Sequence, residues 1–165
     1  MKTLYIIRHA KSSWDNPGQS DFERPLNDRG RKDAPRMGKR LKERGIKPNL
    51  LLSSPAKRAL ATARRISGEI GFDKEKIKTE KRLYHADSET ILEIIQNLNN
   101  KYDTVMLFGH NPGLTDFVNE IMHANLPNLP TCGVVAARFI TDSWLEADAG
   151  TCELLFVDSP KHQTD

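Results

Sequence analysis

Short apolar runs alternate with amphipathic segments along the chain, and this alternation restricts the folds that the chain can adopt. Apolar runs of strand length occupy residues 4–7, 50–52, 104–108, 134–140 and 152–157, with a weaker run at 76–80. Apolar positions at helical spacing occupy the segments at about residues 30–45, 56–70, 88–98 and 113–121. Strands that alternate with helices are typical of a mainly parallel sheet covered by helices on both faces. We therefore predict a single three-layer α/β/α domain over residues 1–165, whose closing strand pair can include an antiparallel member.

Two of the predicted strands end on a histidine. Arg8 and His9 follow the first strand, and His110 comes shortly after the end of another. A serine pair at 53–54 follows a third strand. In parallel sheets the ligand site lies beyond the carboxyl ends of the strands. The sequence therefore predicts that these residues share one crevice.

Three arginines from separate segments are expected to face the same crevice: Arg8 at the strand end, Arg24 in a polar loop and Arg58 in the first turn of a helix. The arginine side chain stays charged at any working pH and matches phosphate oxygens through two parallel N–H groups. A helix N-terminus adds unpaired N–H donors and a positive dipole end. These groups together predict a site for a phosphate dianion.

His9 is the predicted nucleophile of this site. A neutral imidazole has a lone pair that can attack phosphorus near neutral pH, because its ordinary pKa is about 6.5. We expect the other ring nitrogen of His9 to donate to a backbone carbonyl, which leaves the attacking nitrogen unprotonated. His110 is the second imidazole of the predicted site, and its structural alternative is a helix-start residue satisfied by local backbone.

The polar loop at 11–29 holds further predicted substrate contacts. Long loops inside compact domains are usually functional. Three of its side chains are expected to line the pocket: Lys11, Ser12 and Trp14. Two structural alternatives stay open in this loop. Trp14 can serve as a packing anchor, and Arg24 can pair with the aspartate at 21 or at 28 to staple the loop.

Composition and charge exclude several classes of protein. Hydrophobic residues make up 38% and charged residues 28% of the chain, which is typical of folded soluble proteins. The net charge of +3 mildly favours anionic ligands, but the chain lacks the dense basic stripe of a nucleic-acid binder. The first apolar run is too short to span a membrane, and no export signal follows it. We expect a cytoplasmic protein that binds neither nucleic acid nor membrane.

The sequence predicts no metal and no cofactor. Two cysteines form no CxxC pair and are expected to be small core thiols: Cys132 and Cys152. The remaining histidines have no partner at metal-ligand spacing: His85, His123 and His162. The sequence carries no cofactor-binding motif.

Short motifs follow one another along nearly the whole chain: Arg-His-Ala-Lys-Ser at 8–12, Trp14, Asp21, Arg-Pro-Leu at 24–26, Gly30, Ser-Ser-Pro at 53–55, Arg58 and Gly-His-Asn-Pro at 109–112. Their order resembles that of the histidine phosphatase superfamily, which has the phosphoglycerate mutase-like fold, and in particular its SixA-type phosphohistidine phosphatases. Dispersed motifs in the right order form a specific signal, whereas a lone Arg-His pair does not. The resemblance implies a phosphorylated nucleophile at His9 and phosphate clamps at Arg8 and Arg58. It also implies further pocket contacts: Arg24, His110 and Asn111.

Two departures from the wider superfamily bear on the reaction. Ala10 and Lys11 stand where mutase-like members usually have glycine and glutamate, so mutase activity is not expected. The segment that often supplies a general acid has no obvious glutamate, and the proton donor stays open between Tyr84, His85, Asp87 and none. A phosphoramidate has a labile P–N bond, and its leaving group needs less help than an alkoxide. The missing acid therefore favours phosphohistidine over phosphate monoesters.

The sequence thus predicts a metal-free phosphohistidine phosphatase that acts through a phosphohistidine intermediate on His9. The expected partner is a phosphorylated signalling or phosphotransfer protein of the histidine-phosphotransfer type, or a small phosphorylated substrate. Two alternative functions stay open. One is a phosphatase of small phosphomonoesters or sugar phosphates from the same superfamily, and the other is a non-catalytic module that recognises phosphate.

Overall fold

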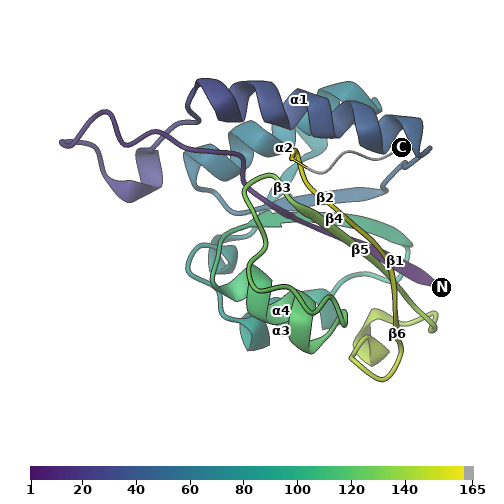
Figure 1. Ribbon diagram of the computed structural model, residues 1–165. Helices are drawn as coiled ribbons and strands as arrows, with labels where there is room; N and C mark the ends of the chain where they lie inside the picture. Colours follow the sequence, from purple (N-terminus) through teal and green to yellow (C-terminus); the bar gives the residue numbers. More distant parts are fainter. Residues whose placement is uncertain (162–165) are drawn as a thin grey trace.

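A six-stranded sheet forms the centre of the computed structural model, which describes residues 1–161 (Figure 1). The strands are β1 (Lys2–Arg8), β2 (Leu50–Ser53), β3 (Lys78–Thr79), β4 (Thr104–Gly109), β5 (Val134–Phe139) and β6 (Cys152–Asp158). Their order across the sheet is β3-β2-β4-β1-β5-β6. The strands β1 to β4 pair in parallel, whereas β5 runs antiparallel to both of its neighbours. The predicted mainly parallel sheet is confirmed, and β5 is its antiparallel member.

Helices cover both faces of the sheet (Figure 1). The helices α1 (Asp28–Glu43) and α2 (Lys57–Ile70) pack on one face, and α3 (Ser88–Gln96) and α4 (Gly113–Glu120) pack on the other. Short 3-10 turns lie in the connections: η1 (Asp21–Glu23), η2 (Lys74–Lys76), η3 (Lys81–Leu83) and η4 (Trp144–Glu146). The predicted three-layer architecture is therefore confirmed. Within residues 1–161, no helix combines the length and the apolar character needed to cross a bilayer.

Alternate residues of the central strand β1 contribute to two separate cores. Leu4 and Ile6 pack in the cluster beneath α3 and α4, and Tyr5 and Ile7 pack in the cluster beneath α1 and α2. Successive side chains of a strand point to opposite faces, so a strand buried on both faces has a continuous apolar sequence. This burial fixes the register of β1 in the sheet. The residues just beyond its carboxyl end are therefore held in place by both cores.

Side-chain caps explain two of the element boundaries that differ from the sequence prediction. The helix α1 begins at Asp28 rather than after Gly30, because the Asn27 side chain accepts a hydrogen bond from the Gly30 N–H and caps the helix. The strand predicted at 76–80 shrinks to β3, because Asp73 caps the turn η2 and leaves only two residues to pair with β2. Local hydrogen bonds from side chains set both boundaries.

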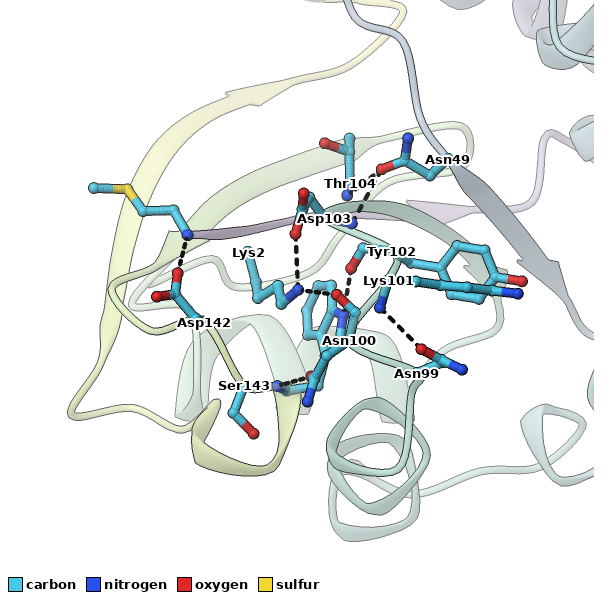
Figure 2. A network of polar contacts seen from close by, with 12 residues as sticks. Lys2, Asn49, Asn99, Asn100, Lys101, Tyr102, Asp103, Thr104, Asp142 and Ser143 are labelled. Carbon is cyan, nitrogen blue, oxygen red and sulfur yellow. Dashed lines mark hydrogen bonds and ion pairs between the residues drawn. The ribbon is translucent and has the colours of Figure 1, made fainter.

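A polar network ties together the amino ends of the parallel strands, opposite the strand ends that carry the histidines (Figure 2). Lys2 is only 2% exposed, and its ammonium group donates to the Asn100 carbonyl at 2.5 Å and to the Asp103 carboxylate at 2.8 Å. The same nitrogen lies 5.9 Å from the centre of the Trp144 ring. The Asn49 side chain accepts from two backbone N–H groups where β4 begins. We call these contacts the amino-end network. They link the starts of β1, β2 and β4.

Replacing Lys2 by alanine is expected to lower the free energy of unfolding by about 1–3 kcal/mol. The Asn100 carbonyl loses a charged donor, and the buried side chain leaves a void. Denaturant unfolding followed by circular dichroism measures the change. Lys101→Ala is the matched control, because Lys101 is an exposed lysine of the same region. An equal loss of stability in both variants would contradict this role of Lys2.

Candidate active site

His9 lies directly after β1 and is 6% exposed. Its Nδ1 lies 2.7 Å from the carbonyl oxygen of Ala10. A carbonyl oxygen can only accept, so Nδ1 carries the proton and Nε2 keeps its lone pair. The Nε–H group of Arg58 points at this second nitrogen from 3.4 Å. The predicted backbone contact of His9 is therefore confirmed, and its unprotonated nitrogen faces an arginine.

The pKa of His9 is lowered from 6.5 to about 3, chiefly because the ring is buried. The hydrogen bond to the Ala10 carbonyl opposes this shift. The charges of the nearby arginines add to it: Arg58, Arg8 and Arg24. The ring is therefore neutral near pH 7, which is the state that a nucleophile needs.

His110 follows β4 and faces His9, with 5.2 Å between the centres of the two rings. Its Nε2 lies 2.8 Å from the hydroxyl oxygen of Ser54, which follows β2. Burial, and then the proximity of His9 and Arg58, lowers the pKa of His110 to about 3. The sequence prediction assigned no such contact to Ser54, although it placed this serine at a strand end and in the Ser-Ser-Pro motif at 53–55.

Two buried polar atoms of the site have no hydrogen-bond partner in the described part of the chain: Arg8 Nε and His110 Nδ1. Such atoms are costly to bury unless a ligand or a water completes them. The other end of Arg8 is held, because its Nη1 donates to the Leu129 carbonyl at 3.0 Å. An oxyanion that reached Arg8 and His110 would satisfy both atoms.

Asp21 ties the arginines of the site together. Its carboxylate accepts from the Tyr84 hydroxyl at 2.7 Å, from Arg58 Nη2 at 3.0 Å and from Arg24 Nε at 3.1 Å. Its backbone oxygen accepts from Arg58 Nη1 at 2.7 Å. Burial raises the pKa of the Asp21 carboxyl, but the hydrogen bonds from Tyr84 and Arg58 and the Arg58 charge outweigh burial and hold that pKa well below its usual range. Asp21 is thus ionised and accepts from Nη1 and Nη2 of Arg58. Only Nε of Arg58 is directed at His9.

A cavity of about 430 Å³ opens beside Arg58 and His110. Its wall also includes several titratable side chains: Asp21, Tyr84, His85, Asp87 and Asp116. The three residues that the sequence left open as proton donors are among them. Residues 111–113, where α4 begins, also line the cavity.

The loop after His9 uses its polar residues to hold its own shape. Arg24 Nη1 donates to Ser12 Oγ at 2.7 Å, and the Arg24 guanidinium lies 3.5 Å from the centre of the Trp14 ring. The Trp14 side chain is 75% exposed. Arg24 therefore forms the loop staple that was its structural alternative, with Asp21 as its partner. In Figure 1 the purple segment after β1 projects beyond the ends of α1 and α2 before the chain enters α1.

The structure places Lys11 and Asn111 in different surroundings. The exposed Lys11 lines a separate hollow of about 260 Å³ and is not brought to the cavity beside His110. Asn111 lines that cavity, but its amide is engaged. Its oxygen accepts from α4, and its NH₂ group donates at 2.9 Å to the Leu129 carbonyl, which also binds Arg8. This geometry favours a positioning role for Asn111 over direct contact with substrate.

Residues 1–161 contain no group of three histidine, cysteine, aspartate or glutamate side chains arranged to hold a metal ion. His123 contacts the Ala149 carbonyl, and His162 lies outside the described residues. Cys132 is buried and Cys152 is half-buried, and both are free thiols.

The protein is expected to lose stability as the pH falls from about 6.5 toward 3. His9 and His110 have pKa values of about 3 in the folded chain, against an ordinary value of 6.5. Between these values the unfolded chain binds more protons, so acidification favours unfolding. The contribution of the two neutral histidines to the free energy of unfolding is complete above a pH of 6.5 and is lost below a pH of about 3.

Denaturant unfolding at neutral pH and in mild acid measures this pH dependence. The double variant His9→Asn and His110→Asn should show a smaller dependence than the wild type. His123→Asn is the control, because it removes an exposed histidine and should leave the dependence unchanged. An unaltered dependence in the double variant would show that these two rings do not cause it.

Residues 4–94 match the model of the histidine phosphatase superfamily (branch 1). An uncharacterized chloroplastic protein of Arabidopsis thaliana is 32% identical over 157 residues, which cover 90% of this chain and 71% of that protein. A candidate phosphohistidine phosphatase SixA from Agrobacterium tumefaciens is 31% identical in its crystal structure. It superimposes with a TM-score of 0.81 over 96% of this chain and 98% of that one.

More distant structures share the fold. The protein histidine phosphatase SixA in complex with tungstate is 22% identical, with a TM-score of 0.80 over 96% of this chain and 97% of that one. A mycobacterial glucosyl-3-phosphoglycerate phosphatase is 14% identical, with a TM-score of 0.66 over 93% and 96% of the two chains. Proteins named for phosphohistidine and for a sugar phosphate therefore have the same architecture as this chain.

Proposed function

This chain belongs to the histidine phosphatase superfamily and is a phosphatase, and on that premise we propose that it hydrolyses phosphohistidine through a covalent intermediate on His9. One observation carries the proposal. The Ala10 carbonyl holds the Nδ1–H of His9, which leaves Nε2 as a buried, unprotonated nitrogen beside Arg58. A neutral, oriented imidazole among arginines is suited to attack on phosphorus.

In the first step, Nε2 of His9 attacks phosphorus in line with the leaving nitrogen of the substrate. The P–Nε2 bond forms as the P–N bond of the substrate breaks. Arg8 and Arg58 face the phosphoryl oxygens, and the free Nε–H of Arg8 is a donor without a partner in the described chain. Positioned donors of this kind typically contribute about 2.7–4 kcal/mol each to lowering the barrier.

In the second step, water attacks phosphorus and the P–N bond to His9 breaks. The intermediate already carries a proton on Nδ1, where the Ala10 carbonyl holds it. His9 therefore leaves as a neutral imidazole and needs no further proton. Both protons of the attacking water stay with the released phosphate, so the second step balances without an additional acid.

The surroundings of the cavity favour a P–N bond over a phosphate ester as the substrate. An alkoxide leaving group needs a protonated acid next to the phosphoryl group. The Asp21 carboxyl stands beside Arg58, but its pKa is held well below the usual range, so it is ionised at working pH. The likeness to a SixA of Agrobacterium tumefaciens supports the same substrate class.

A protein that carries the phosphohistidine is the proposed partner, of the histidine-phosphotransfer type. Its imidazole can enter from outside, because the cavity beside His110 reaches exposed residues such as His85 and Asp87. Two free cysteines suit a reducing compartment, and we therefore propose that the protein acts in the cytoplasm.

The test compares substrates side by side with EDTA present throughout. A phosphohistidine-bearing phosphotransfer protein, N-phosphoimidazole, a phosphoserine peptide and a sugar phosphate are offered at equal concentration, and released phosphate is measured. We expect rapid release from the two P–N substrates and slow release from the two esters. EDTA should change neither rate.

The alternatives predict different outcomes of this experiment. Faster release from the sugar phosphate would identify a metabolite phosphatase. Binding of phosphate without release from any substrate would identify a non-catalytic module. A rate abolished by EDTA would contradict the metal-free reaction.

A further inference from the structure

Four aromatic rings form a series that runs from the nucleophile to the surface. The ring centres of His9 and His110 are 5.2 Å apart, those of His110 and Tyr84 are 5.5 Å apart, and those of Tyr84 and His85 are 3.9 Å apart. His9 and His110 are the inner members, and His85 is exposed. His85 lines the same cavity as His110 and Arg58. An imidazole side chain therefore stands on the outer wall of the cavity, beyond the buried His9 and the half-buried His110.

The chemistry of a P–N bond requires a proton at a particular place. A leaving imidazole departs as a neutral ring only when its other nitrogen, across the ring from phosphorus, receives a proton. In a phosphate ester, by contrast, the atom that needs the proton is bonded to phosphorus directly. The donor for a phosphohistidine therefore has to stand farther from the phosphoryl group than the donor for an ester, on the outer side of the leaving ring.

The other side chains considered as donors are engaged elsewhere. The Tyr84 hydroxyl donates to Asp21, and burial and this hydrogen bond raise its pKa. Asp87 caps α3 by accepting from the Thr90 N–H at 2.8 Å. Hydrogen bonds from the hydroxyl and the backbone of Thr90 lower the pKa of the Asp87 carboxyl, which keeps it ionised. Asp21 is an acceptor already saturated by cations and by Tyr84.

The backbone of His85 adds an independent observation. Its φ is +65°, in the left-handed region, where histidine is enriched among non-glycine residues together with asparagine and aspartate. Here the conformation accompanies the stacking of the imidazole on the Tyr84 ring. Tyr84 is in turn held by Asp21, so the position of His85 is linked to that of Arg58.

We propose that His85 donates the proton to the far ring nitrogen of the leaving imidazole, an inference that rests on the proposed function. In this step the His9 Nε2–P bond forms, the P–N bond of the substrate breaks, and a proton moves from the His85 imidazolium to the departing ring. The products are phosphorylated His9, a neutral substrate histidine and a neutral His85. Histidine is suited to this role because it exchanges protons near neutral pH.

Two model substrates test this step directly. N-phosphoimidazole needs a proton on its far nitrogen, whereas its N-methylated form carries a methyl group and a positive charge there and needs none. In His85→Asn we expect turnover of N-phosphoimidazole to fall about 10²–10⁴-fold, because general acid catalysis is lost. Turnover of the methylated substrate should equal that of the wild type. Asparagine is chosen because it tolerates the left-handed backbone at this position.

Two further variants sharpen the test. Asp116→Asn changes another titratable residue of the same cavity wall and should leave both substrates unaffected. His85→Gly also fits the backbone, and added imidazole should restore its turnover of N-phosphoimidazole.

Each remaining outcome counts against a specific claim. Equal losses on both substrates in His85→Asn would mean that His85 acts only through structure, and no loss on either would exclude it as the donor. Failure of added imidazole to restore His85→Gly would also count against the proton transfer. A wild-type protein inactive on N-phosphoimidazole and on a phosphohistidine protein would overturn the proposed function, and this inference with it.

Discussion

Replacing His9 by alanine is expected to lower turnover by at least about 10⁴-fold, which is the scale of loss when a nucleophile is removed. The Nε–H of Arg58 is directed at His9 Nε2, the nitrogen proposed to bond to phosphorus, and alanine removes that nitrogen. Binding of inorganic phosphate should persist, because Arg8 and Arg58 remain. Steady-state kinetics on N-phosphoimidazole and phosphate titration by calorimetry measure the two quantities.

A quench experiment connects this loss to a covalent intermediate. Wild-type protein exposed briefly to a ³²P-labelled substrate should carry label that is stable in base and labile in acid, as expected of phosphohistidine. His9→Ala should carry none, and His123→Ala should label like the wild type because His123 is exposed. Label of the same kind on His9→Ala would show that another histidine is the nucleophile.

Replacing Arg58 by lysine is expected to lower kcat about 10²–10³-fold although the positive charge is kept. Arg58 uses three separate nitrogens: Nε toward His9, Nη1 toward the Asp21 backbone oxygen and Nη2 toward the Asp21 carboxylate. A lysine ammonium is a point charge on a flexible stem and cannot reproduce this planar set. The same kinetic assay measures the loss.

The control for this variant is Arg64→Lys, which makes the same exchange on an exposed position of α2. It should leave kcat unchanged. The variant Asp21→Asn separates charge from geometry, because it keeps one oxygen for Arg58 but removes the carboxylate charge. Near-normal kcat in Arg58→Lys would show that charge alone is sufficient at this position.

The sheet and the meeting of the strand ends could be predicted from the sequence. Buried strands have apolar sequences, and the carboxyl ends of parallel strands meet at one edge, so His9 and His110 had to lie near each other. The carbonyl partner of His9 also followed from the chemistry of a neutral nucleophile. These predictions rest on periodicity and on general rules of topology.

The role of Asp21 could not be predicted in the same way. It contacts Arg58 and Tyr84, which are 37 and 63 residues away along the chain, and no local pattern reports such contacts. The sequence did offer Asp21 as a partner for Arg24, three residues away. The path of the loop could not be predicted either. Lys11, which was expected to line the pocket, instead lines a separate hollow. Long loops follow contacts that only the folded chain provides.

The amino-end network suggests how this protein can change over evolutionary time. Lys2 and its partners sit at one end of β1, and the reactive histidine follows the other end. No side chain belongs to both sets. Substitutions that raise or lower thermal tolerance at one end can therefore accumulate while selection on chemistry acts at the other. An engineer could likewise strengthen the scaffold there without retuning the reaction.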